Sequence, residues 1–131
     1  MGRTAKRQTQ PQTIETLEAV EIAARAAEEK KATEIVALDL REVASFTEYF
    51  VICTGANTRQ VQAISNSVEE DLRKAGKRPL HIEGYSTGEW ILLDYGDFIM
   101  HVFSNSSRRF YDLERLWRDA GPVKLPEESR A

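Results

Sequence analysis

Residues 90–103 read Trp90-Ile91-Leu92-Leu93-Asp94-Tyr95-Gly96-Asp97-Phe98-Ile99-Met100-His101-Val102-Phe103. Two runs rich in Ile, Leu, Phe and Val flank the pair Tyr95-Gly96, and a glycine readily adopts the positive φ that a two-residue hairpin loop requires. The stretch therefore predicts a β-hairpin that is closed at Tyr95-Gly96. In that register Asp94 lies opposite Asp97, and Trp90 lies opposite His101.

The predicted hairpin has two unlike faces, because successive side chains of a strand point to opposite sides of the sheet. One face is wholly apolar and is expected to lie in the core: Ile91, Leu93, Phe98, Met100 and Val102. The other face is mixed: Trp90, Leu92, Asp94, Asp97, Ile99 and His101. A Trp beside acidic groups indicates a docking surface, whereas two converging carboxylates would indicate a catalytic or metal site.

The composition bounds the class of protein. The chain has 131 residues, of which 41% are hydrophobic, enough for one domain with a core and too few for two. The single cysteine, Cys53, cannot form an internal disulfide and lies in an apolar run, which favours a buried thiol in a reducing, cytoplasmic compartment. No run approaches the roughly 18 apolar residues of a membrane-spanning helix, so we expect a soluble protein without membrane contact.

The charge is unevenly distributed. The formal net charge is −3, yet the first twelve residues carry only basic charges (Arg3, Lys6 and Arg7), so the rest of the chain is more acidic than the whole. An acidic body is a poor main binder of nucleic acid, because phosphate contacts need concentrated Lys and Arg. It is better matched to a basic protein surface.

Apolar runs predict the strands. The continuous apolar runs 35–40 and 49–54 are typical of buried strands, residues 80–83 of a shorter one, and the hairpin supplies the fourth and fifth. Helical segments precede, separate and follow these strands. This order predicts an α/β (α+β) fold, in which a mixed sheet of about five strands is flanked by helices.

Three helices are predicted. The first is rich in Ala, is capped by Thr13 and reaches about Lys30. The second covers 57–75, where Asn57 and Gln60 have the spacing of a capping box. The last is expected to start at Ser107, to bury Phe110, Leu113, Leu116 and Trp117, and to end at Gly121-Pro122. Residues 1–12 then form a disordered basic tail, 13–121 one domain, and 122–131 a C-terminal tail.

Other groups of residues suggest further chemistry. Residues 54–59 join a strand to a helix N-terminus, where free amides and Arg59 could hold an anion, but no phosphate-loop motif is present and a capped turn is the alternative. Asp39 could join Asp94 and Asp97 in a metal site. The two histidines and the cysteine have no zinc-site spacing. A small basic cluster consists of Arg73, Lys74, Lys77 and Arg78, and it is suited to a secondary RNA contact.

Several motifs in order carry a resemblance to a known family. They are Glu48-Tyr49-Phe50-Val51-Ile52-Cys53-Thr54-Gly55, Thr58-Arg59-Gln60-Val61, Glu83-Gly84, Trp90 to Asp97, His101-Val102-Phe103, and Arg109-Phe110-Tyr111-Asp112-Leu113-Glu114-Arg115-Leu116-Trp117. From the first helix to Trp117 the chain resembles the ribosomal silencing factor family, also called the Iojap family. Two departures are Glu48, where the family usually has Asp, and a longer N-terminal tail.

The resemblance implies a non-enzymatic factor that needs no cofactor. Such a factor binds the large ribosomal subunit through its ribosomal protein number fourteen, sterically blocks joining of the small subunit, and represses translation under nutrient limitation. The family fold is similar to that of nucleotidyltransferases, but the Gly-Ser turn and Asp-x-Asp pair of those enzymes are absent. The partner-binding candidates on the family pattern are Trp90, Asp94, Tyr95, Asp97 and His101, with Arg59.

Two interpretations from other classes stay open on the residues alone. A small metal-dependent nucleotidyltransferase would use Asp39, Asp94 and Asp97 and would need magnesium. A homodimeric, RNA-associated adaptor would use the basic cluster at 73–78 and would bind RNA with a steep dependence on salt.

Overall fold

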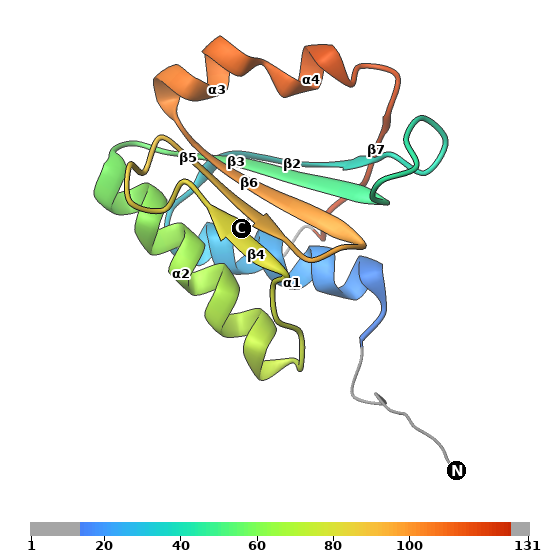
Figure 1. Ribbon diagram of the computed structural model, residues 1–131, viewed down its shortest axis with the longest axis horizontal. Coiled ribbons are helices and arrows are strands. Elements are labelled where there is room, and N and C mark those ends of the chain that lie inside the picture. The colour runs from blue at the N-terminus through green and yellow to red at the C-terminus, as the bar shows by residue number, and fades with distance from the viewer. Residues whose placement is uncertain (1–13, 127–131) are drawn as a thin grey trace.

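The computed structural model describes residues 14–126, which form a six-stranded sheet with helices on both faces (Figure 1). The helices are α1 (Thr16–Glu29), α2 (Thr58–Lys74), α3 (Asn105–Tyr111) and α4 (Leu113–Leu116). The strands are β2 (Thr33–Asp39), β3 (Tyr49–Gly55), β4 (His81–Glu83), β5 (Trp90–Asp94), β6 (Phe98–Ser104) and β7 (Gly121–Pro122). The α/β (α+β) class and the flanking helices are therefore confirmed, with six strands in place of about five.

The strand order is β4-β5-β6-β3-β2-β7, and the sheet is mixed. Strands β3 and β6 are parallel, and every other neighbouring pair is antiparallel. All seven residues of β3 are buried, as expected for a continuous apolar strand that is covered on both faces. The predicted strands over 35–40 and 49–54 thus occupy the centre of the sheet.

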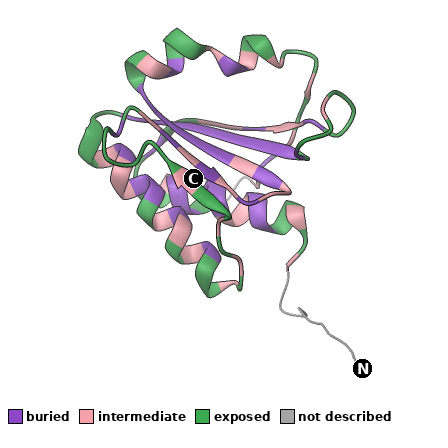
Figure 2. Cartoon of the chain, viewed as in Figure 1, coloured by how far each residue is buried: buried purple, intermediate pink, exposed green. Residues whose placement is uncertain are grey.

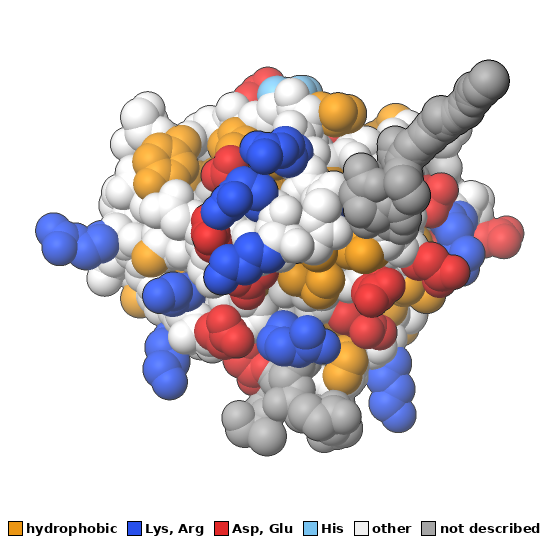
Figure 3. Space-filling view, turned by 90° about the horizontal axis from the view of Figure 1, so that it is seen from below, with side chains coloured by type: hydrophobic (Ala, Val, Ile, Leu, Met, Phe, Trp, Pro, Cys, Tyr) orange, Lys and Arg blue, Asp and Glu red, His pale blue; other side chains and the backbone are white. Residues whose placement is uncertain are grey.

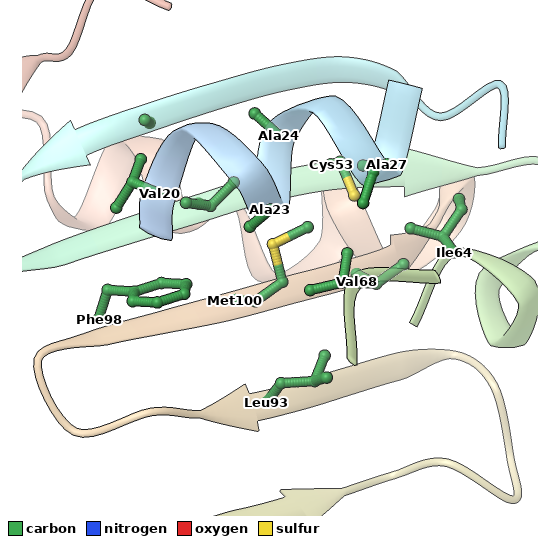
Figure 4. Close-up of a cluster of buried hydrophobic side chains, with 14 of the residues drawn as sticks. Val20, Ala23, Ala24, Ala27, Cys53, Ile64, Val68, Leu93, Phe98 and Met100 are labelled. Carbon is green, nitrogen blue, oxygen red and sulfur yellow. The ribbon is translucent and has the colours of Figure 1, made fainter. Parts of the chain in front are cut away.

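Helices α1 and α2 cover one face of the sheet and enclose the larger core. Alanines dominate the buried side of α1, and Ala19, Ala23, Ala26 and Ala27 are fully buried. Such small side chains let the helix approach its neighbours closely. Figure 4 shows Ala23 and Ala27 of α1 with Ile64 and Val68 of α2 over side chains of the sheet.

The fully buried Cys53 belongs to this core, and burial raises the pKa of its thiol to about 12. The thiol therefore stays protonated and behaves as a small apolar group. The expectation of a buried cysteine is confirmed.

The second helix begins as the sequence predicts. The Asn57 side chain accepts a hydrogen bond from the Gln60 amide at 2.8 Å, which satisfies a free amide of the first turn. The Gln60 side chain also accepts from the Ala56 amide at 2.6 Å and donates to the Lys30 carbonyl at 3.0 Å. One glutamine thus ties the start of α2 to the end of α1.

The hairpin closes one residue later than expected, so the predicted register is wrong. Asp94 pairs with Ile99, Trp90 pairs with Phe103, and the Tyr95 amide bonds the Phe98 carbonyl at 2.9 Å. Gly96 and Asp97 therefore form the loop, with φ of +89° at Gly96, and glycine is favoured at the first loop position of a type II′ turn. Because the partners shift by two residues and faces alternate with period two, the predicted faces are nevertheless correct for the strand residues. Asp97 is the exception, because it lies in the loop and contacts Thr16 and Lys77 instead of sharing the mixed face.

The predicted last helix is two short helices. The Ser104 side chain, not that of Ser107, caps α3 by accepting from the Ser107 amide. Asp112 adopts a left-handed conformation with φ of 48° and separates α3 from α4. The break changes the phase of the helix, so Leu113 and Trp117 pack toward the sheet, whereas Phe110 and Leu116 are 79% and 71% exposed. The predicted apolar stripe is therefore wrong for these two residues.

The folded part extends past the predicted boundary at residue 121. Gly121–Pro122 forms β7 beside β2, and the Val123 amide donates to the Ala37 carbonyl at 2.9 Å. Leu125 is 4% exposed and belongs to the larger core. A two-residue strand that contains Gly and Pro carries no recognisable strand pattern. At the other end, α1 starts at Thr16, and the predicted Thr13 cap and the 1–12 tail lie outside the described residues.

Figure 2 shows that the purple, buried residues concentrate in the central strands and on the inner sides of the helices. Within residues 14–126, no helix combines the length and the apolar character needed to cross a bilayer.

The larger core predicts a specific loss of stability. Ile64 is fully buried on α2, whereas Asn66 on the same helix is exposed. We expect Ile64→Ala to lower the free energy of unfolding by about 2–5 kcal/mol through the lost burial and the cavity left behind. We expect Asn66→Ala to change it by about 0.5 kcal/mol or less. Urea unfolding followed by circular dichroism measures both, and equal losses would contradict the assignment of the core.

Candidate partner-binding face

The sheet face that carries α3 and α4 is only partly covered. Helix α3 packs against β6 and β3, while β4 and β5 lie farther toward the sheet edge (Figure 1). The register places His81 opposite Asp94 and Glu83 opposite Leu92, so their side chains share this face. We call the resulting surface the docking face, and it consists of His81, Glu83, Trp90, Leu92, Asp94 and Ile99. It keeps four residues of the mixed hairpin face predicted from the sequence and adds two from β4, whereas His101 is buried beneath it and Asp97 lies elsewhere.

Trp90 is held firmly at the inner side of the docking face. Its indole Nε1 donates a hydrogen bond to His101 Nδ1 at 3.0 Å. Its ring lies 5.0 Å from the ring of Phe103 and 4.5 Å from the ring of Tyr111. Contacts from β6 and α3 thus fix the orientation of a half-buried Trp, which is the state in which an aromatic anchor loses little entropy on binding.

His101 lies beneath this Trp and is 3% exposed. Burial lowers its pKa to about 3, so the imidazole is neutral at physiological pH. Because Nδ1 accepts from Trp90, the proton is on Nε2, and Nε2 has no hydrogen-bond partner within the described residues. The ring instead packs at 74° against Phe50, with the centroids 4.4 Å apart. His101 can therefore act on a partner only through Trp90.

The outer side of the docking face is acidic. Glu83 and Asp94 flank His81, whose Nε2 lies 3.4 Å from Glu83 Oε2 and 3.8 Å from Asp94 Oδ2. No Lys or Arg among residues 14–126 forms an ion pair with either carboxylate. The face therefore combines an aromatic anchor and apolar side chains with two carboxylates, which suits a partner with basic residues.

Comparison with known proteins identifies the family of this chain. A family model described as "Ribosomal silencing factor during starvation" matches residues 12–131. The chain belongs to the ribosomal silencing factor family.

Individual relatives agree with this assignment. The ribosomal silencing factor of Halalkalibacterium halodurans is 37% identical over 108 residues, which cover 82% of this chain and 92% of that protein. The ribosomal silencing factor of Bacillus subtilis is 39% identical over 101 residues, or 77% and 86% of the two chains. The crystal structure of a protein from Chromobacterium violaceum is similar with a TM-score of 0.79 and 36% identity, and it covers 85% of this chain and 91% of that chain. The recognition of the family from its motifs is confirmed.

Two of the predicted site residues on the hairpin lie away from the docking face. Tyr95 is 5% exposed, and its ring stacks on that of Phe98 at 4.9 Å in the larger core. Asp97 accepts hydrogen bonds from Thr16 Oγ1 at 2.8 Å and from Lys77 Nζ at 3.1 Å. Both residues therefore hold the hairpin against α1 and the segment that follows α2.

Arg59 lies in the first turn of α2, which packs on the opposite face of the sheet. Its side chain is exposed and forms no ion pair within the described residues. The structure thus places Trp90 and Asp94 on the docking face with His101 beneath Trp90, and it places Arg59, Tyr95 and Asp97 elsewhere.

The carboxylates of the predicted metal site do not converge. Asp39 lies on the α1/α2 face of β2 and is paired with Arg41 at 2.8 Å, which lowers the pKa of this carboxyl. Asp94 lies on the other face of β5, three strand spacings or about 14 Å away along the sheet. Among residues 14–126, no group of three His, Cys, Asp or Glu side chains could hold a metal ion.

The basic cluster of residues 73–78 in this silencing factor is largely neutralised. Arg73 pairs with Glu70 at 2.7 Å, Lys74 lies 3.9 Å from Glu70, and Lys77 pairs with Asp97 at 3.1 Å. Of these four basic residues only Arg78 forms no ion pair within the described part of the chain. Figure 3 shows basic and acidic side chains interspersed on this side of the molecule.

Sequence reasoning missed two features of this region. Glu83 and His81 join the docking face because β4 pairs with β5, and the alternation of residues 80–83 beside the hairpin was the available signal. The exposure of Phe110 and Leu116 was missed because the helical spacing of apolar residues does not predict the left-handed conformation of Asp112.

The buried imidazole predicts a dependence of stability on pH. His101 has a pKa of about 3 in the folded protein and an ordinary value of 6.5, so the unfolded chain binds the extra proton between these two values. Stability must therefore fall as the pH falls below 6.5, by about 2 kcal/mol at pH 5.

The variant His101→Gln removes the titration and keeps an acceptor for the Trp90 indole. We expect urea midpoints measured from pH 7.5 to pH 5 to fall less for His101→Gln than for the unchanged protein. Asn66→Ala provides the control, since it changes an exposed side chain that does not titrate and should leave the pH dependence intact. An equal fall of the urea midpoint with pH for the unchanged protein and for His101→Gln would contradict the proposal that the buried His101 causes the pH dependence.

Proposed function

We propose that this protein binds the large ribosomal subunit through its ribosomal protein number fourteen and blocks joining of the small subunit. The bound domain excludes the small subunit by its volume, so translation is repressed under nutrient limitation, in the cytoplasm and without catalysis. The family and the relatives named ribosomal silencing factor support this proposal. So does one observation on the site: the fixed Trp90 shares a partly covered sheet face with the carboxylates of Glu83 and Asp94.

The site residues contribute in two ways under this proposal. Trp90 and Asp94 contact the partner directly, because both lie on the docking face and are partly exposed. His101, Tyr95 and Asp97 act through the shape of the hairpin, since they are buried or paired within the domain. Arg59 is an outlying contact. The basic residues Arg73, Lys74, Lys77 and Arg78 contribute at most a weak contact to ribosomal RNA, given their ion pairs.

The main prediction concerns affinity for the isolated ribosomal protein. We expect Trp90→Ala and Asp94→Lys each to weaken binding by about 2 kcal/mol, or roughly 30-fold, as at an interface hot spot. Glu83→Lys should act in the same direction, and its side chain is 71% exposed, so it disturbs no packing. Isothermal titration with ribosomal protein number fourteen measures all three.

The matched control is Glu18→Lys, an identical charge reversal at an exposed position of α1 on the opposite side of the sheet. It should bind as the unchanged protein does. A subunit-joining assay on sucrose gradients should show that the variants with weak affinity also fail to keep the subunits apart. Unchanged affinity of all three docking-face variants would sink the proposal.

The enzymatic alternative has its own test. A metal-dependent nucleotidyltransferase would bring Asp39, Asp94 and Asp97 together around magnesium, and in this structure they lie apart. We therefore expect nucleoside triphosphates with magnesium to leave the melting temperature unchanged in a thermal-shift assay. A rise in melting temperature that needs both the nucleotide and magnesium, and that Asp94→Asn abolishes, would favour the enzyme.

A further inference from the structure

A second surface of the molecule has the composition of a binding site. A shallow groove lies along α3 and α4 where the left-handed Asp112 separates them. Its main lining residues are Arg109, Phe110, Tyr111, Arg115, Leu116 and Arg118. We call it the arginine groove. It is distinct from the docking face, although Tyr111 contacts Trp90 with the ring centroids 4.5 Å apart, so the two surfaces adjoin.

The arginine groove presents large apolar side chains to solvent. Phe110 is 79% exposed and Leu116 is 71% exposed, while the neighbouring Leu113 is buried. The left-handed break that lets Leu113 and Trp117 pack toward the sheet turns these two side chains outward. Among the described residues the ring of Phe110 packs against one other ring, that of Tyr111, edge-on with the centroids 4.9 Å apart. Its ring is therefore available for stacking.

The groove also holds arginines that the fold does not neutralise. Arg115 and Arg118 form no ion pair within residues 14–126, and Arg109 approaches only Glu34, at 3.5 Å, with its side chain 65% exposed. By contrast, Arg108 is buried and paired with Glu114. A guanidinium binds phosphate oxygens in a bidentate manner and stacks on flat rings. Free arginines beside an exposed aromatic ring are thus suited to RNA.

We propose that the arginine groove binds single-stranded or loop segments of RNA, with a base stacked on Phe110 and phosphates on Arg115 and Arg118. Assignment of this RNA to the large ribosomal subunit rests on the proposed function. A domain that is bound to a protein of that subunit lies close to ribosomal RNA. A protein occupant is less suited to the groove. Phe110 and Leu116 offer too little apolar surface for the buried centre of a protein interface.

Two carboxylates oppose this binding and make it testable. Asp112 and Asp119 also line the groove, so three arginines leave an excess of one positive charge. The RNA contact is therefore weak alone and adds to the protein contact at the docking face. Asp119 is exposed and forms no ion pair within the described residues, so its removal should strengthen RNA binding without disturbing the fold.

The experiment measures fluorescence anisotropy of a labelled single-stranded RNA of about ten nucleotides. We expect the double variant Arg115→Gln/Arg118→Gln to weaken binding and to reduce the slope of log affinity against log salt by about 1.4, or 0.7 per lost phosphate contact. We expect Phe110→Ala to weaken binding about tenfold through lost stacking. Asp119→Asn should bind more tightly than the unchanged protein.

The matched control is Arg73→Gln/Arg78→Gln, which removes the same charge from the basic cluster near the end of α2 and should weaken binding less than the groove variant. Equal losses for the two double variants would mean nonspecific charge attraction and would overturn the proposal. So would tighter binding of a Glu-rich peptide than of RNA at the groove. All these side chains are exposed, and urea unfolding confirms that each variant is folded.

The two proposals fail separately in these measurements. The groove variants should keep their affinity for isolated ribosomal protein number fourteen, because no residue of the docking face is changed. If that protein binds and the RNA responses are absent, the arginine groove is not an RNA site and the proposed function stands. If RNA binds as expected but ribosomal protein number fourteen does not bind, the arginine groove remains an RNA site. Its RNA is then not assigned to the ribosome.

Discussion

The burial of β3 on both faces is the constraint on which the rest of the structure depends. Tyr49–Gly55 lies at the centre of the sheet with every residue buried, and a parallel neighbour, β6, extends the same burial. A strand of this kind needs an apolar cover above and below it. The alanine-rich α1 with α2 supplies one cover, and α3 with α4 supplies the other. The fold follows from the need to cover one continuous apolar run twice.

The two covers differ in extent, and the difference creates the functional surfaces. Helices α1 and α2 are long and close the larger core, whereas α3 and α4 are short and leave the β4 and β5 side of their face open. The smaller core is completed by aromatic rings, among them the partly exposed Trp90. The same short cover turns Phe110 and Leu116 outward. Incomplete coverage of one sheet face thus gives both the docking face and the arginine groove.

Much of the fold could be predicted because buried residues recur in the sequence at the regular spacings of strands and helices. The run Phe50-Val51-Ile52-Cys53 has no polar interruption, and Asn57 with Gln60 marks the start of α2 without ambiguity. Alternation assigned every strand residue of the hairpin to the correct face even with the wrong register, since a shift of two residues leaves a side chain on its face, and only the loop residue Asp97 was misplaced. The motifs identified the family. The residues that contact a partner could not be derived in the same way, because those contacts form only in an assembly with other molecules.

The errors share a physical origin in local backbone choices. Asp94 accepts a hydrogen bond from the Gly96 amide at 2.8 Å and helps to set the turn at Gly96 and Asp97. Asp112 adopts a left-handed conformation that a non-glycine residue rarely takes, and it divides a helix that periodicity predicts as one. Among the site residues, Tyr95 follows Asp94 at the end of β5 and lies on the core side with Ile91 and Leu93. Asp97 pairs with Lys77 within the domain. Tertiary partners of this kind leave no trace in residue spacing.

The pairing of β7 with β2 has a consequence for the behaviour of the chain in solution. Without Gly121–Pro122, β2 would be an outer strand of seven residues, half apolar, with a free row of amides and carbonyls. Such an edge invites pairing with the edge of another molecule. The short final strand places a proline at that border, which has no amide to offer a further strand. Strand β7 therefore protects the Leu38–Asp39 end of β2 against pairing with another molecule.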